Sequence, residues 1–345
     1  MIELNEKFAL LALPRANLIN SVKDLVLSNG LQVTRTLPLK IGGNWERWIG
    51  EIRVKQLQEA GCYLLVTGPT SSPEILDGDN QELMRRINGF LNALLIVKTP
   101  CLAAKPILLT GANVLGEIRV RQMIDLHTPI CQAYNQSAIE RVLNQKDLES
   151  AAIMADALLR INAEPQATRL KRAIVAFLAG IHEPRPDERL HQFCRCIDGI
   201  VLSGKGSGKK DFKSRTALFI GSGHETVAEE IYEMRSAVEH LRPAETEAID
   251  CSDLKAQRTR VLVRAVQTEI IARRCLNRIL LCADLLRRFE NDEQIRQFWK
   301  LPENERKQAW KALNFDEDLA QAVDPRLINN DDLGLHASNE NGGCA

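Results

Sequence analysis

Residues 1 to about 135 alternate short apolar runs with Gly, Pro and Ser. The runs are 8–13, 25–37, 62–68, 93–97 and 106–111. Apolar runs of this length, bounded by turn residues, are typical of strands. A segment with helical spacing (81–94) lies among them, and WERWIGEIRVKQLQEAG (45–61) fits either a strand or a helix, with Trp45 and Trp48 expected in the core. We therefore expect a mixed, largely β N-terminal domain, whose fold the pattern leaves open.

Two local features of this domain are informative. Asn29-Gly30 lies between apolar segments and predicts a hairpin turn. The heptapeptide GEIRVKQ (50–56) returns as GEIRVRQ (116–122). One interpretation is a duplicated half-domain, and the other is chance similarity between two basic edge strands. In the first, four basic side chains would form a ligand surface: Arg53, Lys55, Arg119 and Arg121.

From Ser137 onward the pattern becomes helical. The segments with a period near 3.6 residues are 137–161, 167–181, 187–202 and 255–288. One or two short helices carrying Trp299 and Trp310 should follow and dock on the helical domain. The sequence thus predicts an α+β protein, with a β or mixed domain before an all-α bundle. The expected parts are 1–135 (a sensor or partner-binding domain), 136–290 (the helical domain), 291–323 (accessory helices) and 324–345 (a disordered tail).

The segment 222–243 is expected to be an amphipathic helix with both ends marked. Ser222 and Glu225 have the spacing of a capping box, and Pro243 should stop the helix at about Leu241 or Arg242. Its apolar stripe should face a core and consists of Val227, Ile231, Met234, Val238 and Leu241. The other side carries Tyr232, Ser236, Glu239 and His240, with Arg235 at its boundary. This arrangement displays an Arg-x4-His pair.

An Arg and a His separated by four residues near a helix end resemble the signature of HEPN domains. The flanking segments RLHQFCRCIDGIVLSGKGSGKKDFKSRTALFIG (189–221) and EIIARRCLNRILL (269–281) are similar to the Apea-like branch of that family. The resemblance covers roughly residues 150–290. It implies an α-helical domain, a metal-independent ribonuclease activity without a cofactor, RNA as the substrate and a homodimer with a composite site.

The residue types suit that chemistry. A histidine can act as base or acid near neutral pH, and a guanidinium offers forked donors that match phosphate oxygens. His240 and Arg235 are the candidates for these roles, with Ser236, Glu239 and Tyr232 in support. Five residues at about 100° each place Arg235 and His240 about 140° apart around an ideal helix. Two copies related by a twofold axis would bring both pairs into one cleft.

One position departs from the family pattern. The family usually has Asn, Asp or His directly after the Arg, whereas this chain has Ser236. Two functions therefore stay open. The first is a HEPN endoribonuclease, a regulated toxin or effector in antiphage defence whose N-terminal domain senses a protein or phage trigger. The second is an inactive module that dimerises or binds RNA or a nucleotide within a defence system. A more remote third is an adaptor whose β domain does all the recognition.

Basic residues outside this pair are candidate RNA contacts. Three lie in SGKGSGKKD (203–211), expected to be a basic loop between two helices: Lys205, Lys209 and Lys210. This segment is no phosphate-binding P-loop, because Ser203 replaces the first Gly and Lys210 replaces the hydroxyl residue. The long helix adds Arg273 and Arg274. The alternative concerns five arginines of this helix: most are solvated and some pair with glutamates of 225–239. The five are Arg258, Arg264, Arg273, Arg274 and Arg278.

Composition excludes few functional classes. The chain has 345 residues with 45 basic and 45 acidic side chains, so net charge gives no indication of a nucleic-acid partner. The nine cysteines are scattered without a CxxC pair, and we expect reduced structural thiols and no metal. No signal peptide or membrane span is visible. We therefore expect a cytoplasmic protein without a membrane partner.

Overall fold

The computed structural model describes residues 2–14, 24–42, 45–100, 102, 104–129, 142–202, 208–221, 223–248 and 253–311. The chain divides into two compact units, one with the elements up to Glu164 and one with those from Pro165 onward. An N-terminal antiparallel sheet followed by helices confirms the expected mixed α+β class. The expected disordered tail, 324–345, lies outside the described residues.

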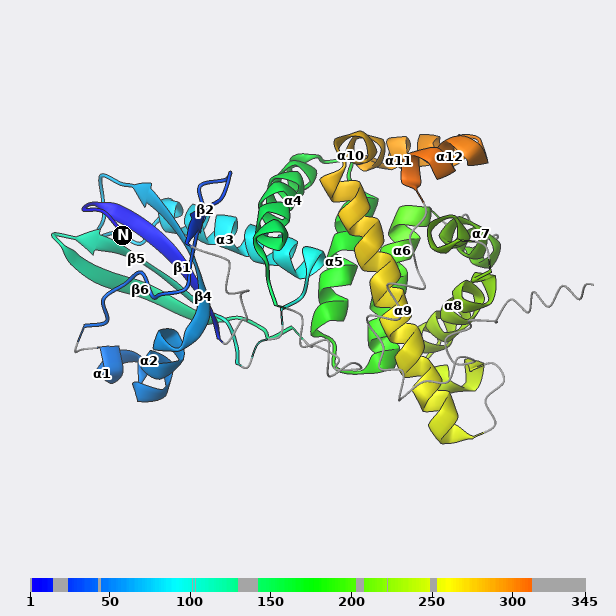
Figure 1. Ribbon diagram of the computed structural model, residues 1–345, viewed down its shortest axis with the longest axis horizontal. Helices are drawn as coiled ribbons and strands as arrows, with labels where there is room; N and C mark the ends of the chain where they lie inside the picture. Colours follow the sequence, from blue (N-terminus) through cyan, green and yellow to red (C-terminus); the bar gives the residue numbers. More distant parts are fainter. Residues whose placement is uncertain are drawn as a thin grey trace, which may run out of the picture. The chain divides into compact units, whose positions relative to one another are not determined.

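The first unit is built on a six-stranded antiparallel sheet with the order β2-β3-β4-β1-β5-β6 (Figure 1). Its strands are β1 (Glu6–Pro14), β2 (Leu25–Val26), β3 (Gln32–Thr34), β4 (Ala60–Pro69), β5 (Ile107–Val114) and β6 (Glu117–Asp125). The apolar runs 8–13, 62–68 and 106–111 are strands as predicted. The hairpin is also confirmed, because β2 and β3 pair across a turn in which Gly30 has a φ of 76°.

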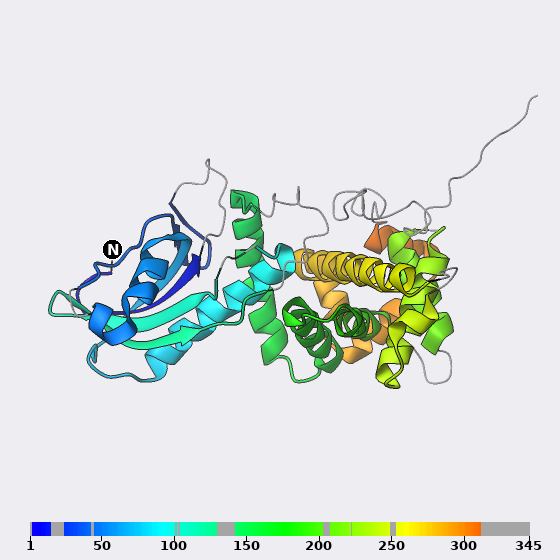
Figure 2. The ribbon, with the colours of Figure 1, turned by 90° about the horizontal axis from the view of Figure 1, so that it is seen from below.

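Helices cover both faces of this sheet. Phe8, Leu10 and Ala12 face α1 (Trp45–Ile49) and α2 (Glu51–Gln58) in one buried cluster. Alternate residues of β1 point the other way, toward α3 (Gly78–Val97), which lies on the opposite face (Figure 2). Helix α4 (Gln145–Ala163) packs on α3.

Three expectations about this unit need correction. The run 93–97, grouped with the strand-like runs, is the end of α3, where Ala93–Ile96 are all buried and amphipathic spacing disappears. Trp45 is in the core as expected, but Trp48 is exposed. Helix α4 lies in the first unit, whereas the sequence boundary at residue 135 placed it with the helical domain. Helix α4 belongs to the first unit because it packs on α3, although the sequence around it is helical like that of the second unit.

The two copies of the heptapeptide adopt different structures, so the duplicated half-domain is wrong. Residues 51–56 begin α2, with Gly50 as its N-cap. Residues 117–122 form β6, because Leu115 and Gly116 both have positive φ and turn the chain back onto β5. The four basic side chains of the repeat therefore do not lie on two equivalent strands. Arg53 on α2 instead forms an ion pair with Asp125, which lies outside the repeat.

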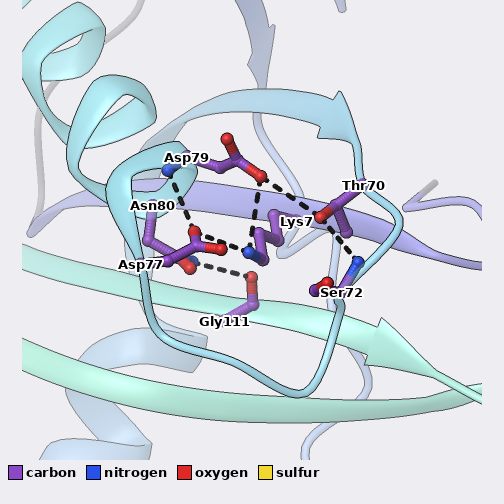
Figure 3. Close-up of polar contacts among 7 residues, drawn as sticks. All are labelled: Lys7, Thr70, Ser72, Asp77, Asp79, Asn80 and Gly111. Atoms are coloured by element: carbon purple, nitrogen blue, oxygen red, sulfur yellow. Dashed lines mark hydrogen bonds and ion pairs between the residues drawn. The ribbon is translucent and has the colours of Figure 1, made fainter.

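The start of α3 is anchored to the sheet by a buried lysine (Figure 3). Lys7 on β1 is fully buried, and its Nζ lies 2.6 Å from Asp77 Oδ1 and 3.5 Å from Asp79 Oδ2. Asp77 also caps α3 by accepting a hydrogen bond from the Asp79 amide. The Asn80 side-chain amide donates to the carbonyl of Gly111 on β5 at 3.4 Å. The buried ammonium group of Lys7 thus has its carboxylate partners, Asp77 and Asp79, at the start of α3.

The second unit is a helical bundle around its longest helix, α9 (Figure 1). Its elements are α5 (Thr168–His182), α6 (Pro186–Val201), α7 (Gly208–Ile220), α8 (Glu225–Glu239), the 3-10 turn η2 (Ala244–Glu247), α9 (Leu254–Leu281), α10 (Ala283–Phe289), α11 (Asp292–Lys300) and α12 (Glu303–Trp310). The helices predicted at 167–181 and 187–202 are confirmed. The long segment 255–288 is divided at Cys282 into α9 and α10. As predicted, Trp299 and Trp310 dock on the unit, both against Phe219.

Buried ion pairs join the helices of this unit. Glu230 on α8 is fully buried and accepts hydrogen bonds from Arg260 and Arg264 on α9. Arg189 on α6 bonds to Glu269 on α9 at 2.6 Å. The expectation that arginines of the long helix pair with glutamates of 225–239 is thereby confirmed.

Candidate functional site

Helix α8 lies with its apolar side in the core. Val227, Ile231, Met234 and Val238 are all buried, as the stripe predicted. The helix begins at Glu225, whose carboxylate accepts a hydrogen bond from the Gly223 amide. Ser222, the other member of the expected capping box, lies outside the described residues. The core-facing stripe fixes which residues of α8 face the polar side.

The end of α8 differs from the expectation. The last helical residue is Glu239, and His240 is the C-cap. The Arg242 amide donates to the Ala237 carbonyl at 2.8 Å and the Leu241 amide donates to the Val238 carbonyl at 3.0 Å, which is a Schellman ending. Leu241 has the left-handed φ of 57° and is 96% exposed. It was wrongly placed in the stripe, because the helix stops before reaching it.

Arg235 and His240 have different environments. His240 is exposed, as expected. Arg235 was expected at the boundary of a displayed face, but its side chain is only 17% exposed. One guanidinium nitrogen lies 2.8 Å from Glu239 and another lies 3.6 Å from Asp198 on α6. Glu239 therefore occupies one guanidinium donor, Asp198 lies beyond hydrogen-bond distance, and the buried Nε has no partner among the described residues.

The supporting residues of α8 contribute unequally. Glu239 is the ion-pair partner of Arg235. The ring of Tyr232 lies under the Arg235 guanidinium at 5.7 Å and against Phe212 at 5.4 Å. Burial raises the pKa of Tyr232 above its ordinary value. Ser236 is half-buried one residue beyond Arg235. Tyr232 thus packs within the unit and also holds the guanidinium from one side.

A histidine that the sequence analysis missed belongs to the same cluster. His191 lies on α6, and its side chain is 16% exposed. Burial lowers its pKa, and the positive charges of Arg235 and Arg195 lower it further. His191, Arg195 and Asp198 are separated by four and three residues, so they share one face of α6. That spacing was visible in the sequence, but nothing in it indicated that this face meets Arg235.

Two of the three basic candidates near α7 lie in a helix and not in the expected loop. Helix α7 begins at Gly208, so Lys209 and Lys210 are helical, and Lys205 lies outside the described residues. Lys209 Nζ lies 2.9 Å from Glu229 and 2.5 Å from Glu233, and these hydrogen bonds, led by that to Glu233, raise its pKa. Lys210 is exposed. The structure thus ties Lys209 to α8 and leaves Lys210 toward solvent.

The candidate contacts on α9 also differ from each other. Arg273 bonds to Glu269 at 2.8 Å, and its guanidinium lies 5.1 Å from the centre of the Phe177 ring. Arg274 is exposed. RNA contact therefore stays a prediction that suits the exposed Arg274 better than Arg273, whose guanidinium already contacts Glu269 and Phe177.

The cluster has no arrangement suited to a metal. Within the described ranges, no group of three or more His, Cys, Asp and Glu side chains is placed to hold a metal ion. Cys194 and Cys196 are buried thiols, and burial raises the pKa of both. What the cluster offers is a guanidinium between carboxylates, one half-buried imidazole and one exposed imidazole.

Comparisons of the chain with known protein families, with characterised proteins and with solved structures found no match. Among the described helices, none is both long enough and apolar enough to cross a membrane. The functional argument therefore rests on the geometry of the helical unit and on the sequence resemblance.

Proposed function

We propose that the helical unit is a metal-independent endoribonuclease of the HEPN type, acting as a homodimer. The observation that carries the proposal is the placement of the Arg-x4-His pair. Helix α8 exposes His240 at its C-cap and holds Arg235 five residues earlier against α6. An imidazole open to solvent near a positioned guanidinium is what cleavage by 2′-hydroxyl attack requires.

The proposed reaction needs no metal. The 2′-oxygen attacks the adjacent phosphorus as a base takes its proton, and the bond to the 5′-oxygen breaks as an acid protonates that oxygen. The products are a 2′,3′-cyclic phosphate and a 5′-hydroxyl. One His240 acts as the base, a second acts as the acid, and Arg235 binds the non-bridging oxygens through paired donors.

A second copy of the chain supplies the second imidazole. Arg235 and His240 lie about 140° apart on an ideal helix, so one copy does not direct both at the same phosphate. A twofold axis beside the end of α8 would place two such pairs around one cleft. Leu241, 96% exposed beside His240, is an apolar group that such an interface would cover.

Cleavage is tested with purified protein and RNA in EDTA. Wild type should release fragments ending in 2′,3′-cyclic phosphate, and His240→Ala should release none. The matched control is Arg242→Gln, which changes another exposed polar side chain at the same helix end. Equal cleavage by wild type and His240→Ala would refute the role of His240.

Arg235 needs a separate control, because its removal also breaks ion pairs. Asp198→Asn removes one of its partners and leaves the guanidinium. We expect Arg235→Gln to abolish cleavage and Asp198→Asn to reduce it without abolishing it, because Asp198 only helps to orient the guanidinium. Loss of cleavage in both would indicate that the pair is structural. Mixing His240→Ala with wild-type protein should lower cleavage by more than simple dilution, because a mixed dimer contains only one of the two imidazoles.

The second candidate function is a binding module without catalysis. The ion pairs from Arg235 to Asp198 and Glu239 favour it, since they occupy the guanidinium at rest. Tight RNA binding without cleavage, unchanged in His240→Ala, would support this alternative.

RNA cleavage inside a cell must be restrained, which fits a regulated toxin or effector in antiphage defence with the first unit as its sensor. This biological role rests on analogy. Expression of wild type should arrest growth where expression of His240→Ala does not.

A further inference from the structure

A second feature of the helical unit is a cavity of about 920 Å³ between α7, α11 and α12. Five cationic side chains line it, along with two carboxylates and Trp299. The cations are Lys210, Lys213, Arg215, Arg306 and Lys307. Its size is in the upper part of the range for small-molecule pockets, roughly 300–1,000 Å³.

Both carboxylates of the cavity already have partners. Glu303 lies 2.5 Å from Lys307. Glu225 accepts the hydrogen bond from the Gly223 amide at 3.0 Å. Lys213 is paired with Glu229, which lies outside the cavity lining, at 2.5 Å. Arg215 also lies 3.8 Å from Asp211 on its own helix. The ion pairs thus neutralise three of the five cations, and Glu225 keeps its negative charge beside the other two, Lys210 and Arg306.

The two remaining cations are not ion-paired with a carboxylate among the described residues, although the charge of Arg306 helps to lower the pKa of Glu303. Within the described parts of the chain, neither Lys210 nor Arg306 makes an ion pair, and the buried Nε of Arg306 has no hydrogen-bond partner. A buried guanidinium nitrogen without an acceptor is unfavourable unless a ligand or water supplies one. The cavity therefore combines uncompensated positive charge with an unused donor.

The wall that carries this charge is held in place by Trp299. Its indole nitrogen donates to the Ile200 carbonyl at 2.8 Å, which fixes the ring. The guanidinium carbons of Arg215 and Arg306 lie 5.2 Å and 5.5 Å from the ring centre. Arg215 also donates to the carbonyls of Val201 and Leu202. Donors positioned before binding lose less freedom when a ligand arrives.

We infer that this cavity is a binding site for a phosphate-bearing ligand. Guanidinium and ammonium groups form strong, charge-assisted hydrogen bonds with phosphate oxygens. Lys210 and Arg306 supply the direct contacts, and Lys213 and Lys307 add positive charge at the walls. A free nucleotide and the backbone of RNA share this chemistry. The inference is independent of the cleavage proposal, because it needs neither Arg235 nor His240.

The test is isothermal titration of the full-length protein with three probes: inorganic pyrophosphate, ADP and a ten-nucleotide oligo(U). The variants are Lys210→Gln, which changes an exposed residue, and Arg306→Gln. The control is Arg296→Gln, which removes a half-exposed guanidinium of α11 that pairs with Glu293 outside the cavity. Each cavity variant should weaken binding by about tenfold, and the control should bind as wild type does.

The pattern of probes identifies the source of the phosphate. Binding of pyrophosphate and ADP points to a free nucleotide, whereas binding of oligo(U) alone points to the RNA backbone. Absence of binding by all three probes, or equal binding by Lys210→Gln and wild type, would overturn the inference. His240→Ala should bind the probes normally, so loss of cleavage and loss of this site are separate outcomes.

Discussion

Replacing Glu230 should destabilise the helical unit more than any comparable change on the surface of α8. The carboxylate is 0% exposed, and its Oε2 accepts from Arg264 Nε at 2.6 Å and from Arg260 Nε at 3.2 Å. Glu230→Gln keeps the shape but removes the negative charge that Glu230 supplies to two buried guanidiniums, one of them 0% exposed. Removing one member of a buried ion pair costs about 3–5 kcal/mol, and we expect a loss in that range.

The matched control is Glu233→Gln on the same helix. Glu233 pairs with Lys209 at 2.5 Å, but its side chain is 34% exposed, so water replaces the lost partner. Exposed pairs contribute roughly 0.2–1 kcal/mol. Both variants break an ion pair, so the difference between their losses of unfolding free energy measures the effect of burial.

The measurement is urea unfolding followed by pulsed hydrogen–deuterium exchange. Peptides of α8 and α9 then report the helical unit alone, which matters because the chain has two units. A loss of unfolding free energy below about 1 kcal/mol in Glu230→Gln would refute this reasoning, since that is the loss expected for an exposed ion pair. The triple change of Glu230, Arg260 and Arg264 to Met should be far less harmful than Glu230→Gln, because it removes the charges together.

Two further predictions concern titrating groups. Because Arg235 lowers the pKa of His191 more than Arg195 does, Arg235→Gln should raise that pKa more than Arg195→Gln in an NMR titration; equal shifts would contradict the cluster geometry. A folded-state pKa below the unfolded value of about 6.5 also means that protonation of His191 weakens the fold as pH falls below that value. In the first unit, Asp77→Asn should lower the free energy of unfolding more than Lys7→Met. The first change leaves the 1%-exposed Lys7 charged without its nearest carboxylate, whereas the second leaves carboxylates that water can reach. The hydrogen bond from Lys7 lowers the pKa of Asp77, so this contribution is present above the unfolded pKa and is lost as acid titrates the folded carboxylate; urea unfolding across pH 2 to 7 measures both effects.

Much of the secondary structure follows from local pattern. Strands β1, β4 and β5 coincide with short apolar runs, and α5 and α6 with segments of helical period. The failures lie where contacts outside a segment, rather than its own pattern, decide its structure. The heptapeptide at 50–56 is helical and the one at 116–122 is a strand, because only the second has a turn that returns it to β5.

The candidate site shows the same division. The Arg-x4-His spacing and the apolar stripe of α8 were readable from the sequence, and four of the five stripe residues are buried. The partners of Arg235 were not readable, because Asp198 lies 37 positions earlier and reaches the guanidinium only through the contact of α6 with α8. Glu230 looked like one more acidic residue of α8 until α9 brought two arginines to it.

The carboxylates around Arg235 bear on how a phosphate would reach it. Glu239 is 45% exposed, so its release from the guanidinium returns it to water at little cost. Asp198 is 28% exposed and lies 3.6 Å away, which is beyond a strong hydrogen bond. A phosphate group that replaces Glu239 therefore gains a forked contact while Asp198 keeps the guanidinium oriented. On the proposed function, Glu239 would act as an exchangeable occupant of the phosphate position, and Asp198 and Tyr232 would hold Arg235 ready for the exchange.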